Sequence, residues 1–198
     1  MLMLVNLGMG ICIAFKVLAA LVFVAGVEPD CRYVDWSVSF KRLGLSECDR
    51  LGDMIDSLCR SPVGRYADLI DRLERVRCCS IPFPWQEGYD YVHENWWYSM
   101  ETDSTWSLCR PGYFLTGLYR SVFKLYLSDL EEGRCTRPRN HPSKYGHCED
   151  VDISDCFEQA KCCSCPEGSF IVGLYRGNCN DLGCLDKLRC CTLAESPH

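Results

Sequence analysis

A nine-residue motif that occurs in three copies constrains the fold of this chain more than any other feature. The two clearest copies are Gly112–Arg120 (GYFLTGLYR) and Gly168–Arg176 (GSFIVGLYR), and Gly52–Arg60 (GDMIDSLCR) is a weaker third copy. Each copy is followed by a short element of the form Leu-acid-x-x-Arg-Cys. These elements begin at Leu73, Leu130 and Leu185. Elements that recur in one order indicate an internally repeated architecture.

A looser element precedes the nonapeptide in each unit. Asp35–Ser39 (DWSVS) matches Asn95–Ser99 (NWWYS), and Asp150–Ser154 (DVDIS) is the third copy. The repeat period is therefore about 55–60 residues. The units lie near 35–79, 95–135 and 150–191, and the links between them contain proline and tyrosine.

The nonapeptides predict β-strands, because they are rich in β-branched and aromatic residues and each begins with glycine. Side chains alternate between the two faces of a strand, so every second residue shares a face. One face then carries Phe114 and Leu118, Phe170 and Leu174, and Met54 and Leu58. We expect this face to line a shared core.

Small residues in mid-strand, Ser57, Gly117 and Gly173, suggest a place where another backbone passes close. Segment 68–77 (DLIDRLERVR) fits a short helix or, by its repeat register, a strand. Three β-units that cannot each bury their apolar face would pack around a common axis. The sequence therefore predicts one all-β, disulfide-rich domain over residues 27–198, with three pseudo-symmetric units in a β-prism-like or compact trefoil-like arrangement.

The first residues predict a signal peptide. Val17–Val27 (VLAALVFVAGV) is an apolar run directly after Lys16, and small residues follow it. This order is typical of a cleaved signal, and we place the cut after Gly26, so that residues 1–26 are removed. The alternative, an uncleaved anchor, would place a lysine in mid-membrane at a cost. We therefore expect a secreted, extracellular protein.

Cysteine usage agrees with export. The chain has 17 cysteines, and Cys12 lies in the predicted leader, which leaves 17 − 1 = 16. An even number in an oxidising compartment predicts up to eight disulfides, whose pairing the sequence does not specify. These residues are Cys31, Cys48, Cys59, Cys78, Cys79, Cys109, Cys135, Cys148, Cys156, Cys162, Cys163, Cys165, Cys179, Cys184, Cys190 and Cys191.

The charge balance and the motifs bear on function. A formal net charge of −6 argues against nucleic acid and against electrostatic attraction to an anionic membrane surface. The sequence has no GxSxG, no HExxH and no phosphate-cradling glycine loop. We therefore predict no catalytic residues and no cofactor.

Two patterns are superficially like metal-binding motifs. The spacing of Asp150, Asp152 and Ser154 resembles the opening of a calcium loop, but that loop needs glycine and glutamate where this chain has Asp155 and Lys161. The CxxC within residues 162–165 could bind zinc, but in an exported chain these cysteines are expected to form disulfides. We predict no metal site.

Aromatic side chains are the remaining candidates for ligand binding. Seven of them crowd between residues 85 and 106, where they would form core if buried, or would stack on sugars or enter a membrane interface if exposed. Adjacent strand residues face opposite sides, so Trp96 and Trp97 should not share one core. The arginine that ends each nonapeptide fits an anionic ligand or, preferably, an ion pair with the acid of the Leu-acid element. The candidate ligand-binding residues are Trp96, Trp97, Tyr119, Arg120, Tyr175 and Arg176.

These motifs, together with residues 141–148 (HPSKYGHC), resemble a cysteine-rich module. It is the C-terminal module of the perivitellin-2 heavy subunits of apple snails and of related secreted invertebrate proteins. The resemblance covers nearly all of residues 31–191. It implies a β-prism with three-fold pseudosymmetry that follows a perforin-like domain and helps in membrane recognition. The 198 residues leave no room for a perforin-like domain, so pore formation is not carried over.

The sequence thus predicts a secreted, non-enzymatic binding module. A glycan or a lipid headgroup is the expected ligand, nucleic acid is not expected, and a separate pore-forming or matrix protein is a candidate partner. The first alternative is a structural protein of an extracellular matrix, egg coat or shell. The second is a venom or defence protein.

Overall fold

The computed structural model describes residues 30–62, 69–82, 85–121 and 125–195. The predicted signal peptide, residues 1–26, lies outside these ranges. Within them, twelve antiparallel strands form three four-stranded sheets. The first sheet has the order β1 (Cys31–Asp35), β4 (Leu73–Cys79), β3 (Met54–Arg60) and β10 (Cys162–Ser164). The second has the order β2 (Gly44–Glu47), β7 (Phe114–Arg120), β8 (Leu130–Pro138) and β5 (Tyr89–Asn95). The third has the order β6 (Thr105–Leu108), β11 (Ser169–Arg176), β12 (Leu185–Thr192) and β9 (Cys148–Asp152).

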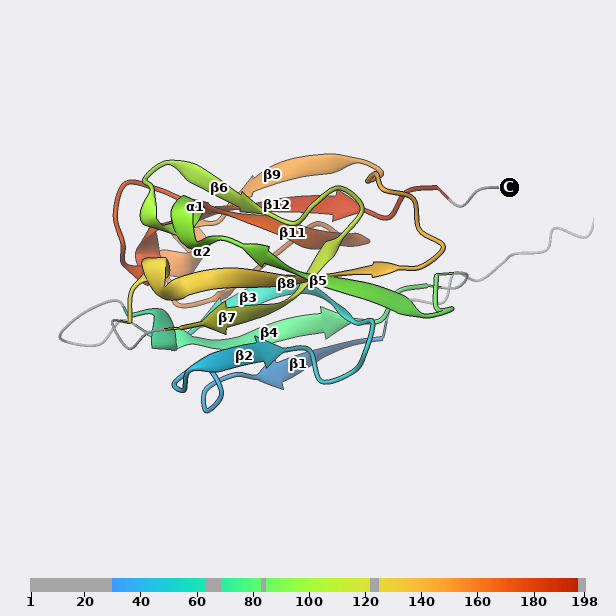
Figure 1. Cartoon of the computed structure of the whole chain (residues 1–198). Coiled ribbons are helices and arrows are strands. Elements are labelled where there is room, and N and C mark those ends of the chain that lie inside the picture. Colours follow the sequence, from blue (N-terminus) through green and yellow to red (C-terminus); the bar gives the residue numbers. More distant parts are fainter. Residues whose placement is uncertain (1–29, 63–68, 83–84, 122–124, 196–198) are drawn as a thin grey trace, which may run out of the picture.

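Short helices connect the strands. The α-helices are α1 (Trp97–Glu101) and α2 (Ser154–Glu158), and both lie at the left end of the view in Figure 1. Each last strand of a unit is preceded by one 3-10 turn, at Ile70–Arg72, Leu127–Asp129 or Leu182–Cys184. The predicted all-β class is confirmed. Segment 68–77 is divided: residue 68 lies outside the described ranges, Ile70–Arg72 forms the first of these turns, and the part from Leu73 onward is strand β4, as the repeat register predicted.

The three units exchange strands. Each unit supplies four strands, but its second strand joins the sheet of another unit: β2 pairs with β7, β6 with β11 and β10 with β3. The last of these pairings returns from the third unit to the first and closes the cycle. The central strands β3, β7 and β11 also contact one another. The units therefore form one interlocked body, while their β-prism arrangement stays a prediction.

A β-bulge interrupts each central strand and changes the expected core. In β7 the register against β8 shifts between Leu115 and Gly117, and β3 and β11 shift at the equivalent place. A bulge reverses the alternation of side chains beyond it. Leu115 and Leu118 therefore lie in the same core cluster, whereas Phe114 packs with Phe170 in a second cluster. The expected single face is thus divided between two cores, although all its predicted residues are buried.

The glycines beyond the bulge lie where another backbone passes, as predicted. A Cβ atom on Gly117 would stand 2.8 Å from the carbonyl oxygen of Ser46 on β2. A Cβ atom on Gly173 would stand 2.9 Å from the carbonyl oxygen of Ser107 on β6. At these two positions the absence of a side chain lets the exchanged strand approach. The third predicted position, Ser57, also pairs with an exchanged strand, β10, although it has a small side chain.

Each unit begins with an Asx turn, and this turn corrects the alignment of the third copy of the looser element that precedes the nonapeptide. The side chains of Asp35 and Asn95 accept the backbone N–H two residues later, at 2.8 and 3.0 Å. In the third unit Asp152 does so, at 3.1 Å, so the third copy is anchored two residues later than Asp150. The buried Ile153 then takes the position of the buried Trp96, a correspondence that residue identity does not show.

Eight disulfides pair all sixteen cysteines of the described residues, which confirms a disulfide-rich fold. Three of them, called the frame disulfides, recur in every unit and tie the residue after the exchanged strand to the last strand of its own unit. The frame disulfides are Cys48–Cys78, Cys109–Cys135 and Cys165–Cys190. The others are Cys31–Cys79, Cys148–Cys191, Cys59–Cys162, Cys156–Cys163 and Cys179–Cys184. The predicted CxxC cysteines are therefore held in disulfides.

Candidate functional site

Three clefts occupy equivalent places between neighbouring units, within the parts of the chain that the structure describes. Each contains the arginine of one Leu-acid-x-x-Arg-Cys element, and we name each cleft by the strand of that arginine. The β12 cleft contains Arg189, the β4 cleft Arg77 and the β8 cleft Arg134. The opposite wall is the loop after the exchanged strand. The first residue of that loop donates its N–H to the residue at the bulge: Cys109 to Val172, Cys165 to Asp56 and Cys48 to Thr116, at 2.7–2.9 Å.

The β12 cleft is the largest, with a volume of about 450 Å³. Its lining is Leu108, Cys109, Pro111, Tyr145, Cys148, Glu149, Asp150, Val172 and Arg189. Arg189 donates from Nε and Nη2 to the two carboxylate oxygens of Asp150, at 2.7 and 3.0 Å. These hydrogen bonds lower the pKa of Asp150 and raise the pKa of Arg189, so both groups are charged at neutral pH. The guanidinium also lies 4.4 Å from the ring centroid of Trp106, and this ring packs against Tyr175.

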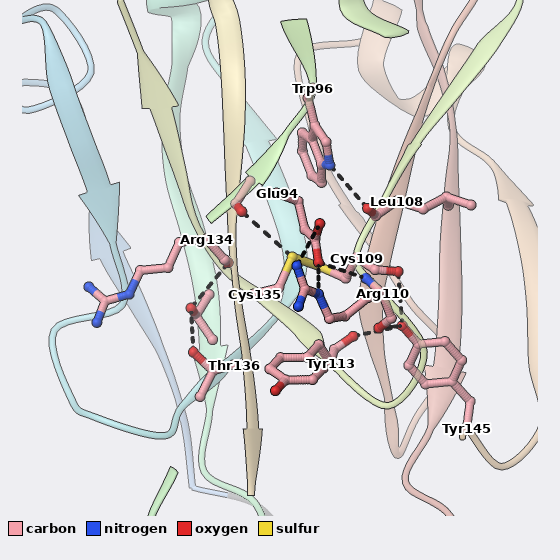
Figure 2. Close-up of a disulfide and its surroundings, with 12 residues drawn as sticks. Glu94, Trp96, Leu108, Cys109, Arg110, Tyr113, Arg134, Cys135, Thr136 and Tyr145 are labelled. Carbon is pink, nitrogen blue, oxygen red and sulfur yellow. Dashed lines mark hydrogen bonds and ion pairs between the residues drawn. A yellow bond between two sulfur atoms is a disulfide. The ribbon is translucent and has the colours of Figure 1, made fainter. Parts of the chain in front are cut away.

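The loop that forms one wall of the β12 cleft is fixed from both sides (Figure 2). Cys109 is joined to Cys135, and the Trp96 indole donates to the carbonyl oxygen of Leu108 at 3.1 Å. The Tyr145 hydroxyl lies 2.8–3.3 Å from the carbonyl oxygens of Cys109, Arg110 and Tyr113. Burial raises the pKa of Tyr145, which keeps the phenol protonated as a donor. The wall is therefore held in place without a ligand.

The β4 cleft has a volume of about 360 Å³. Arg77 donates from Nε and Nη2 to both oxygens of Asp56, at 2.8 and 2.7 Å, and these bonds raise the pKa of Arg77. Glu167 and Gly168 form the loop wall, and among the described residues no atom beyond Gly168 and its two chain neighbours lies within 4 Å of where a Cβ atom on Gly168 would stand. The sulfur atoms of Cys31 and Cys79 lie near Asp56, but they form a disulfide and are not thiolate ligands for a metal.

The β8 cleft is almost filled, with a volume of about 20 Å³. Glu47, on the exchanged strand β2, forms an ion pair with Arg134 across it. The Arg134 guanidinium also lies 4.6 Å from the ring centroid of Tyr91. Thr116 and Thr136 share a hydroxyl–hydroxyl hydrogen bond of 3.0 Å on its floor. Such a volume holds about one water molecule.

The predicted ligand residues do not lie in these clefts, as far as the described ranges go. Trp96, Arg120 and Arg176 are buried, Tyr119 and Tyr175 are partly buried, and Trp97 is 54% exposed. The pair Trp96 and Trp97 thus separates as expected, at the start of helix α1 rather than on a strand.

The expected partners of the nonapeptide arginines are also different. Arg176 donates to the carbonyl oxygen of Cys179 at 2.8 Å and pairs with Asp103 at 2.9 Å, rather than with Asp186 of the Leu-acid element. Burial lowers the pKa of Arg120, whose guanidinium lies 5.9 Å from the Phe40 ring. These arginines are too buried to meet a ligand.

The cleft arginines were missed, although the signal was available. Arg77, Arg134 and Arg189 occupy the same position of the Leu-acid-x-x-Arg-Cys element in all three units. A repeated charged residue on a partly exposed strand was a better candidate than the arginine at the end of a fully buried strand.

Comparison of the chain with family models, with curated proteins and with solved structures finds no match. The resemblance to the cysteine-rich invertebrate module therefore stays a prediction.

Proposed function

We propose that the protein is a secreted, non-enzymatic module that binds glycans on surfaces through the clefts between its units. One observation carries this proposal: two equivalent clefts combine a charged Arg–carboxylate pair with apolar groups in their walls. Their volumes of about 450 and 360 Å³ fall within the range of small-molecule sites. Equivalent clefts on one rigid body would raise avidity for a repeating surface.

The disulfides support the secreted location in this proposal. Eight disulfides are typical of extracellular proteins, because cytosolic thiols are kept reduced. Through the ranges that the structure describes, no helix has the length and apolar character of a membrane span.

Two assays on refolded protein that begins at residue 27 test the proposal. We expect binding on a glycan array and no flotation with liposomes of zwitterionic or anionic lipid. Flotation without array binding would assign the surface to lipid headgroups instead. The absence of binding in both assays would contradict the proposal.

A structural role in an extracellular matrix, egg coat or shell is the second candidate. Its supporting observation is the Cys59–Cys162 disulfide, which joins β3 to β10 and so links the first unit covalently to the third. A matrix protein would remain in the insoluble tissue fraction until it is reduced or decalcified. A binding module would be extracted by salt or by competing sugar.

A further inference from the structure

We infer that the β12 and β4 clefts each take one uncharged sugar ring, while the β8 cleft takes none, so that the protein is bivalent. This inference rests on the proposed function and specifies its ligand class and its stoichiometry. Its three supports are the charge of the clefts, the chemistry of their walls, and the side chain that fills the third one.

The charge of both open clefts disfavours anions. The β12 cleft contains two carboxylates, Glu149 and Asp150, against one guanidinium. The β4 cleft repeats this balance with Asp56 and Glu167 against Arg77. Each cleft thus has one excess negative charge, and its arginine is already engaged on two nitrogens. Sialylated or sulfated sugars and phosphate headgroups would meet a like charge, which costs binding energy.

The polar groups instead suit hydroxyls. A sugar hydroxyl both donates and accepts a hydrogen bond, whereas a carboxylate only accepts and an ammonium group only donates. The Asp150 carboxylate retains acceptor capacity beyond its two bonds from Arg189, and Asp56 does so beside Arg77. A pair that offers donors and acceptors side by side matches neighbouring hydroxyls of a pyranose ring.

The apolar walls suit the C–H face of such a ring. The β12 cleft is bordered by Leu108, Pro111 and Val172. The β4 cleft is bordered by Phe170 and by the Cys31–Cys79 disulfide. The lining of the β12 cleft is mostly apolar with a few placed polar groups, which is typical of small-molecule sites, whereas the lining of the β4 cleft is about equally polar and apolar.

The third cleft is filled because its carboxylate comes from the opposite wall. Glu47 pairs with Gly117 in the sheet, as Leu108 pairs with Gly173 and Ser164 pairs with Ser57. Only this copy of the position is acidic, and its side chain reaches Arg134 across the cleft. In the open clefts the carboxylate lies on a strand that pairs directly with the strand of the arginine, β9 with β12 and β3 with β4, which draws the guanidinium along the wall. In the β8 cleft the central strand β7 lies between the strands of Glu47 and Arg134.

Isothermal titration of residues 27–198 tests the inference, with the methyl glycoside of the best neutral sugar from the array. We expect two equivalents bound per chain. Asp150→Asn and Asp56→Asn should each remove one equivalent, because each removes the carboxylate of one open cleft and leaves the other cleft intact. Glu47→Gln, the matched change in the β8 cleft, should leave both. Because Asp56 is buried, Glu167→Ala is a second variant of the β4 cleft, and we expect at least tenfold weaker binding there.

The outcomes separate this inference from the proposed function. Array binding with one or three equivalents would overturn the inference and leave glycan binding in place, as would two equivalents that survive Asp150→Asn and Asp56→Asn. A preference for sialylated or sulfated glycans would also overturn it. An array without any bound glycan would overturn both.

Discussion

The β12 and β8 clefts share one backbone and differ in the strand that supplies the carboxylate. In the β12 cleft, Asp150 lies on the edge strand β9 directly opposite Arg189, so the ion pair joins two directly paired strands. In the β8 cleft, Glu47 lies on the exchanged strand β2 and reaches Arg134 from the other wall. Their volumes are about 450 and 20 Å³. One position on the exchanged strand therefore largely decides whether a cleft is open.

The edge strands reinforce this difference. The Cys148–Cys191 disulfide joins two directly paired residues at the edge of the β12 cleft. The equivalent pair in the second sheet is Tyr91 and Thr136, and the Tyr91 ring lies beneath Arg134. The compact disulfide leaves space in the β12 cleft, whereas at the equivalent place in the β8 cleft the Tyr91 ring packs against Arg134. The comparison teaches that the repeat preserves its frame and diverges in the side chains that face each cleft.

The largest expected effect concerns what the clefts share. Removing any one frame disulfide by a double Cys→Ala change should lower the free energy of unfolding by about 3–4 kcal/mol. The loss should be similar for all three, because the paired cysteines are 30, 26 and 25 residues apart. Urea denaturation measures it. A loss below about 1 kcal/mol for one pair alone would show that the units do not share one frame.

A smaller effect concerns the loop wall of the β12 cleft. Tyr145→Phe removes the hydroxyl that donates to the 109–113 loop, and we expect a loss of about 1 kcal/mol in unfolding free energy. Tyr89→Phe is the matched control, because Tyr89 packs on Gly52 of the equivalent loop while its hydroxyl has no hydrogen bond to a described residue. Equal losses in the two variants would contradict the role of the Tyr145 hydroxyl.

Opening the β8 cleft should cost little stability. Glu47→Leu places there the residue found at the equivalent position, Leu108, and removes the ion pair with Arg134. Because the Glu47 side chain is 42% exposed, we expect a stability change below about 1 kcal/mol. A crystal structure of the variant should show the cleft enlarged several-fold. A cleft that stays at its present volume would show that Tyr91 and the 48–53 loop fill it without Glu47.

The parts of the fold that could be predicted from the sequence are those in which the same residue types recur at equivalent positions of the repeat. The central strands follow from the nonapeptides, and the close backbone approach follows from Gly117 and Gly173. The prediction of a single core face was wrong. Strict alternation would place Leu115 and Leu118 on opposite faces, but the bulge before Gly117 brings both into the same core cluster. A bulge depends on how two strands pair, and this pairing is not local information.

The clefts could not be predicted for a related reason. They form between units, and the loop after β6 borders a cleft with β12 only because β6 pairs with β11. Strand exchange of this kind leaves no signal within one unit. Disulfide pairing was equally hidden, since sixteen cysteines allow very many combinations. The repeated Arg189 position was visible, but its role required its neighbours from two units.

The smallest expected effect on stability comes from removing the Asp150–Arg189 ion pair of the β12 cleft. The pKa of Asp150 is lowered by the hydrogen bonds from Arg189, so the pair stabilises the fold above the ordinary aspartate pKa near 3.9. This contribution is lost as the pH falls through the lowered pKa of the folded state. Because Asp150 is 41% exposed, we expect Asp150→Asn to cost only a few tenths of a kcal/mol at pH 7. The difference from the unchanged protein should shrink towards zero in urea titrations at pH 2.

Glu149→Gln is the control, because Glu149 lines the same cleft without pairing with Arg189. A difference that persists at pH 2 would show that Asp150 acts through packing rather than through its charge.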